Sequence, residues 1–327
     1  MAPTLGKFYV KLSKRDNHLL WGNFTVRYAD NELALVERGL YGANARYQSL
    51  DTTRFGERRI AIDGFAADPG TVSSREEFRG TGGSVYFLNR RDLLVGSERL
   101  RVEVRDKASG LVSEVIRLQP ELDYDIDYIQ GRVLLSEPLS AIADDSLLVR
   151  NDGLSGNEVW LVVQYEFTPG FEEVDALNLG GQGHYWLSDF VKLGVTANRN
   201  EEDGVDNSLY AADLTFRKNT RTWLKIQAGR TEGLVSTSQI SGDGGFTFDE
   251  VGEAGFRVDD AYGYRVDLSI GFADVLEGAG GQISLYGQRL EAGYSAPGLN
   301  ARSDTDQYGG LLQMPILDSL DLTAKAD

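Results

Sequence analysis

Hydrophobic and polar residues alternate with a period of two along most of this chain, and long stretches with the 3.6-residue period of a helix are nearly absent. A clear example is the run in which Val191, Leu193 and Val195 alternate with Lys192 and Thr196. In an extended strand, successive side chains point to opposite faces, so each such run has one apolar and one polar face. The alternation therefore predicts an all-β chain of antiparallel strands.

Strand length divides the chain into three regions. Residues 1–79 and 171–327 contain long alternating runs, whereas residues 80–170 contain short runs separated by tight turns such as DKASG at 106–110. We expect N-terminal barrel-type strands in the first region and a small inserted β-sandwich in the second. The third region is expected to be an antiparallel transmembrane-type β-barrel segment that is incomplete, because the final alternating run has no turn after it.

The connections in the third region alternate in length, as they do in outer-membrane barrels. Short connections are expected at 188–189, 218–221, 273–279 and 315–319, and long ones at 200–207, 232–261 and 291–306. A sheet in lipid must close on itself so that every backbone N–H and C=O is paired. Aromatic side chains are expected at the two membrane interfaces: Tyr185, Trp186, Phe190, Tyr210, Phe216, Trp223, Tyr262, Tyr264 and Phe272.

The polar faces of these strands carry charged residues in mid-strand, a placement that suits a wet lumen. The lumen-facing candidates are Lys192, Asp213, Arg217, Lys225, Arg265 and Asp267. They either line a pore or hold a plug, or they pair across neighbouring strands and only keep the interior polar. Both possibilities stay open at the level of sequence.

Composition excludes several function classes. The chain has 33 basic and 50 acidic residues, a net charge of -17, which argues against nucleic acid as a partner. It has no Cys and only two His, so thiolate chemistry and His-rich metal sites are not expected. No apolar run approaches the roughly 20 residues of a membrane helix. We predict no metal, no cofactor and no catalytic residues.

The motif DYDIDY at 123–128 places Asp123, Asp125 and Asp127 on one face of a strand. Three carboxylates at this spacing could bind Ca²⁺, although the motif lacks the Gly and the final Glu of an EF-hand loop. The favoured interpretation is a solvated face balanced by Arg117 and Arg132.

Two segments carry a resemblance to known proteins. The stretch YWLSDFVKLGVTANRNEEDGVDNSLYAADLTFRKNTRTWLKIQAGRTEG at 185–233 resembles the hairpins of large porin-like Gram-negative outer-membrane β-barrel proteins. The segment at 82–139, from GGSVYFLNRR to GRVLLSEPL, resembles a β-rich module of very large proteobacterial outer-membrane proteins and is similar to parts of translocon-type barrels. In the first region, GNF and RGLYGA look like barrel strands preceding that module. The resemblance implies an outer-membrane location and no particular substrate.

We therefore expect a segment of an outer-membrane β-barrel protein, acting as a pore, secretion channel or surface scaffold without catalysis. Its expected partners are outer-membrane lipid and lipopolysaccharide. The alternative is a soluble extracellular β-sandwich protein for binding or adhesion. The two differ in one respect: a sandwich packs the apolar faces into a dry core, whereas a barrel turns them outwards and turns Lys225, Arg265 and Asp267 inwards.

Overall fold

The computed structural model describes residues 8–67, 72–106, 112–142, 157–167, 177–202, 205–234, 238–251, 257–296, 299–301, 303–317 and 320–326. Strands dominate these residues, and one short 3-10 helix, η1 (Phe272–Asp274), interrupts them, so the predicted all-β, mainly antiparallel fold is confirmed. The chain forms two compact units. The first comprises Met1–Pro69, Leu177–Val235 and Arg257–Asp327, and the second comprises Gly70–Ala176 and Ser236–Phe256.

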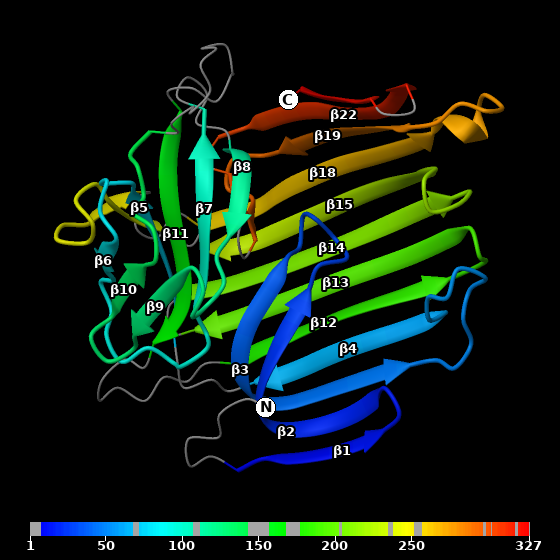
Figure 1. The fold of residues 1–327 in the computed structure, drawn as a ribbon. Helices are drawn as coiled ribbons and strands as arrows, with labels where there is room; N and C mark the ends of the chain where they lie inside the picture. Colours follow the sequence, from blue (N-terminus) through cyan, green and yellow to red (C-terminus); the bar gives the residue numbers. More distant parts are fainter. Residues whose placement is uncertain are drawn as a thin grey trace. The chain divides into compact units, whose positions relative to one another are not determined.

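The first unit contains one twelve-stranded antiparallel sheet, and its strands pair in the order in which they occur along the chain (Figure 1). Its strands in sheet order are β1 (Val10–Lys14), β2 (Asn17–Tyr28), β3 (Val36–Gln48), β4 (Ile60–Ala67), β12 (Leu177–Trp186), β13 (Val191–Glu202), β14 (Val205–Arg217), β15 (Trp223–Leu234), β18 (Arg257–Gly271), β19 (Gln282–Leu290), β22 (Thr305–Leu317) and β23 (Leu320–Ala326). Among the described residues, β1 and β23 are the two edges. A short hairpin, β20 (Ser295–Ala296) with β21 (Leu299–Asn300), lies between β19 and β22 in the chain.

The connections leave the sheet at two opposite ends of its strands. At the turn end, residues 15–16, 49–59, 187–190, 218–222, 272–281 and 318–319 join consecutive strands. At the insertion end, residues 29–35, 203–204 and 291–304 do so, and both segments of the second unit branch from this same end, after β4 and after β15. The first and third regions of the sequence thus join in one sheet, because β4 pairs directly with β12.

The second unit contains two sheets that share one hydrophobic core. The larger sheet has the order β17 (Asp249–Val251), β16 (Ser238–Ser241), β5 (Val72–Arg79), β11 (Glu158–Phe167), β7 (Arg99–Arg105) and β8 (Val112–Arg117), with β5 and β16 parallel. The smaller has the order β6 (Val85–Phe87), β10 (Arg132–Leu135) and β9 (Tyr124–Asp127). Phe78 and Leu161 of the larger sheet and Tyr86 and Val133 of the smaller one are fully buried in the common core.

Two predicted loops differ from the structure. Residues 200–207 were expected to form a long loop, but β13 runs to Glu202 and β14 begins at Val205, with Asn200 opposite Asn207. Polar residues at these positions do not end the strands because both continue the antiparallel ladder of their neighbours. Residues 232–261 were also expected to be a loop of the barrel. They instead contain the end of β15, the start of β18, and the strands β16 and β17 of the second unit.

Candidate functional site

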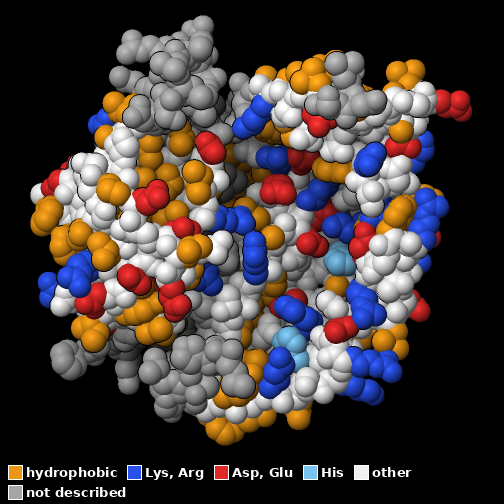
Figure 2. Space-filling model, in the orientation of Figure 1, with side chains coloured by type: hydrophobic (Ala, Val, Ile, Leu, Met, Phe, Trp, Pro, Cys, Tyr) orange, Lys and Arg blue, Asp and Glu red, His pale blue; other side chains and the backbone are white. Residues whose placement is uncertain are grey.

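Strand register places all six lumen-facing candidates on one face of the twelve-stranded sheet. Lys192 is opposite Thr215, Thr215 is opposite Lys225, and Lys225 is opposite Asp267, so these residues form a row across β13, β14, β15 and β18. Opposed residues of an antiparallel ladder lie on the same face, and so do residues two apart. Asp213, Arg217 and Arg265 therefore join this face, which we call the polar face. Figure 2 shows acidic and basic side chains, with histidine between them, gathered over these strands.

The charged groups of the polar face are paired with one another rather than left free. Lys192 Nζ lies 3.7 Å from Asp213 of the neighbouring strand. Arg265 is paired with Asp267 at 2.7 Å and donates to Gln288 at 3.0 Å. Gln227 Nε2 donates to Asp267 at 2.8 Å, and its side chain is almost fully buried. Pairing across neighbours, one of the two possibilities that the sequence left open, is thus present.

Arg217 lies at the turn end of the polar face, beneath the connection formed by residues 49–59. Its guanidinium donates both terminal N–H groups to Glu57 and stacks on Phe55 and Trp186, each ring centroid 4.1 Å away. The hydrogen bonds from Arg217 lower the pKa of Glu57 to about 2. Trp186, which was expected in a membrane interface, lies on the polar face because register places it opposite Lys192, and it is only 4% exposed.

Two residues that the sequence did not single out complete the centre of the polar face. Asp30, in the connection between β2 and β3, accepts from His184 at 3.3 Å and lies 3.7 Å from Lys192 Nζ. The hydrogen bond from His184, aided by Lys192 and opposed by burial, lowers the pKa of Asp30 to about 2. Tyr294, in the connection between β19 and β22, is fully buried. Both lie in irregular connections, where the period of two gives no signal.

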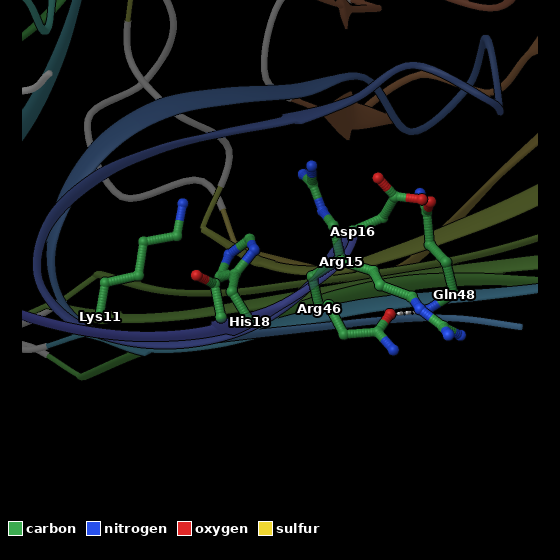
Figure 3. A pocket seen from close by; sticks show the side chains of 8 residues that line it. Lys11, Arg15, Asp16, His18, Arg46 and Gln48 are labelled. Carbon is green, nitrogen blue, oxygen red and sulfur yellow. Dashed lines mark hydrogen bonds between the residues drawn. The ribbon is translucent and has the colours of Figure 1, made fainter.

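A polar hollow of about 340 Å³ lies where β1, β2 and β3 meet (Figure 3). It is lined by Lys11, Ser13, Arg15, Asp16, Asn17, His18, Arg46 and Gln48. Register places Ser13, His18 and Arg46 on the polar face. His18 Nε2 is hydrogen-bonded to Asn44 at 2.7 Å, and Arg46 is paired with Asp63 at 2.6 Å. His18 belongs to β2.

The opposite face of the sheet, which we call the apolar face, exposes large hydrophobic side chains. Val195 is 61% exposed, and the other exposed residues of this face include Leu19, Trp21, Tyr47, Ile62, Tyr185, Leu193, Tyr210, Phe216, Ile226, Tyr264, Val266 and Leu285. In contrast, Thr196, Asn198, Asp213 and Gln227 on the polar face are buried. The polar face also buries apolar side chains, among them Leu20, Phe24 and Phe65. The first unit therefore differs from a water-soluble sheet in the large hydrophobic side chains that its apolar face exposes.

Charged residues interrupt the apolar face of β13, β15, β18 and β19 only towards the insertion end. Arg199 is paired with Glu201, Arg230 with Asp260 at 2.5 Å, and Arg289 of β19 lies 3.9 Å from Asp306. We call these residues the charged rim. Between the rim and the turn end, the apolar face of these four strands carries no charged residue.

The second unit holds its own buried charges. Glu76 is fully buried, where it accepts from the Tyr165 hydroxyl and from the Asn89 N–H at 3.1 Å. Burial raises the pKa of Glu76 to about 7. On the other face of β5 and β7, Glu77 and Glu103 both bind Arg105, at 2.7 and 2.6 Å. These contacts satisfy groups that the fold buries, which is a structural role.

The DYDIDY carboxylates act locally. Asp123 accepts from the Gln119 N–H at 2.7 Å, and Asp127 accepts from the N–H groups of Ile129 and Gln130 at 3.1 and 3.0 Å. Two of the three carboxylates therefore stabilise turns. Within the described part of the chain, no group of three or more His, Cys, Asp or Glu side chains is placed to hold a metal ion.

No protein-family model, curated protein or solved structure matches this chain. No helix among the described residues is long and apolar enough to cross a membrane.

Proposed function

We propose that the first unit is part of an outer-membrane β-barrel, with its apolar face in lipid and its polar face lining a passage for solute or polypeptide. The observation that carries this proposal is the exposure of large hydrophobic side chains along the whole apolar face, opposite a face on which polar side chains such as Asp213 and Gln227 are buried. In water, an apolar surface of this extent would drive association, because soluble monomers rarely expose apolar patches beyond a few hundred Å². In a membrane the same surface is required, since lipid-facing positions must be apolar.

The height of the apolar face agrees with this proposal. On β18 its apolar positions run from Tyr262 to Ile270. Eight residue steps at about 3.4 Å, tilted by about 40°, span roughly 21 Å, close to the apolar band of about 25 Å of outer-membrane barrels. The charged rim then lies at the level of the lipid headgroups. Lipid and lipopolysaccharide are the partners that follow from this placement.

In this proposal the second unit is a β-sandwich attached at the insertion end and folded in water. Its two sheets enclose an apolar core of their own, as the alternative of a soluble β-sandwich protein requires. That alternative accounts for the second unit but leaves the apolar face of the first unit uncovered. The protein acts as a pore if solute moves along the polar face, and as a secretion channel if polypeptide does. It acts as a surface scaffold if nothing passes along this face.

Cysteine labelling of the full chain in lipid vesicles tests the membrane placement, because the natural sequence has no Cys to interfere. We expect Val195→Cys to resist a water-soluble maleimide and to react with a lipid-soluble one. Arg199→Cys, four residues along the same face in the charged rim, and Glu114→Cys, exposed in the second unit, should react with the water-soluble reagent. The proposal would be contradicted, in favour of the soluble alternative, if the water-soluble maleimide labelled Val195→Cys and Glu114→Cys equally and the chains did not float with the vesicles.

A further inference from the structure

Two connections at the insertion end cover the polar face. Residues 29–35 join the adjacent strands β2 and β3, for which a two-residue turn is sufficient. The segment instead contacts β12, β13 and β15, none of which is adjacent to β2 or β3. Residues 291–296, at the start of the connection between β19 and β22, meet it there.

The first segment is held by the Asp30 carboxylate and by backbone groups of Asp30 and Glu32. The Asp30 carboxylate binds His184 and Lys192, and the Asp30 carbonyl accepts from Lys225 Nζ. The Glu32 backbone N–H donates to Gln227 Oε1 at 2.7 Å. Two of the six lumen-facing candidates, Lys192 and Lys225, are therefore engaged by this segment.

The second segment fastens the first through Tyr294. Its hydroxyl donates to the Leu33 carbonyl at 2.8 Å. Its ring lies against Gly229 and Gly263, which are opposite each other on β15 and β18. A Cβ at Gly229 would lie 2.2 Å from the Tyr294 hydroxyl oxygen, so only glycine admits the ring. Around this point Leu33, Ala34, Leu209, Ala211, Ala261 and Leu290 form an apolar cluster on the polar face.

We propose that residues 29–35, fastened by Tyr294, form a plug that keeps the passage along the polar face closed at rest. This inference rests on the proposed function, since a plug needs a passage. The apolar cluster and the contact of the Tyr294 ring with Gly229 and Gly263 determine where the plug lies. The charged contacts of Asp30 are the part of the attachment that water or an anionic group can replace.

The plug is tested by ion flux through phosphatidylethanolamine–phosphatidylglycerol vesicles that contain the full chain. Asp30→Asn removes the charged attachment, and Gly229→Ala displaces Tyr294. We expect each to raise the flux several-fold over the natural chain. Glu32→Gln controls for charge in the same segment, because Glu32 contacts Gln227 through its backbone. Gly183→Ala controls for an added methyl group in a strand, where the nearest atom lies 3.5 Å away. Both controls should behave as the natural chain.

Flotation and hydrogen exchange are measured on the same vesicles to separate the outcomes. Faster exchange confined to residues 29–35 in Asp30→Asn, with increased flux, supports the plug. The plug is overturned if residues 29–35 exchange faster in Asp30→Asn but the flux stays at the level of the natural chain. It is likewise overturned if all variants float with the vesicles and none of them conducts. Failure of the natural chain to float overturns the proposed function instead. If Gly229→Ala does not fold, Asp30→Asn alone decides, because it alters no buried packing.

Discussion

The surroundings of two carboxyl groups of this chain shift their pKa values in opposite directions. Asp30 is held ionised by donors from His184 and Lys192, whereas Glu76 is driven towards its neutral form by complete burial. The difference follows from geometry: Asp30 faces cations, and Glu76 faces a tyrosine hydroxyl and a backbone N–H. A carboxyl group at either position of the sequence looks the same until its partners are known.

The raised pKa of Glu76 predicts a pH-dependent stability of the second unit. Between its ordinary value of 4.5 and about 7, only the folded state holds the proton. Stability therefore falls as pH rises through this window, by about 3 kcal/mol in all, and is level above it. Glu76→Gln, which stays neutral, should remove this slope, and Glu114→Gln on an exposed strand should keep it. Urea unfolding followed by Trp160 fluorescence at pH 4.5 to 8 measures both; an unchanged slope in Glu76→Gln would contradict the assignment.

At the scale of strands, alternation predicted faces and many boundaries well. The alternating runs RVLL at 132–135 and LDLTAKA at 320–326 coincide with β10 and β23. The same pattern failed for β5, VSSREEFR, because charged residues occur on both of its faces, Glu76 on one and Arg75, Glu77 and Arg79 on the other. Glu76 enters the core only because Tyr165 and Asn89 satisfy it, and the parallel partner β16 lies far along the chain. Such long-range partners leave no local signal.

The candidate site divides in the same way. The six charged residues of the polar face follow from counting odd and even positions along their strands. Asp30 and Tyr294 could not be found like this, because their positions depend on where two connections fold after leaving the sheet. The two glycines against the Tyr294 ring could not be found from the sequence either. Gly229 and Gly263 are recognisable as small residues within strands, but that they lie opposite each other depends on the register of β15 and β18.

Strand β13 provides a prediction at this scale. Val195→Arg places a charge in the middle of the apolar face, and Ala197→Arg places it next to the charged rim on the same strand. In lipid, the first should destabilise the protein by about 2–4 kcal/mol and the second by about 0–1 kcal/mol. Urea unfolding of vesicle-inserted protein compares them. Similar, small effects at both positions would mean that water, rather than lipid, covers this face.

At the scale of the whole molecule, the two units should unfold separately. The second unit has its own core and contains Trp160, while Trp21, Trp186 and Trp223 belong to the first unit. In vesicles, we expect the Trp160 signal to change at lower urea than the other three, because lipid protects the strands that it surrounds. Trp160→Phe should abolish the early transition and leave the late one. A single coincident transition would show that the units unfold as one.

The parallel pairing of β5 with β16 has a consequence for the order in which the molecule can be built. About 160 residues separate these strands in the chain, among them β12, β13, β14 and β15 of the other unit. Most strands of the twelve-stranded sheet must therefore be synthesised before the second unit can receive β16 and β17, its last two strands. Contacts this distant in sequence form slowly. Until β16 arrives, the free edge of β5 can bind another strand, so a chaperone that shields this edge while the chain folds would have a defined target.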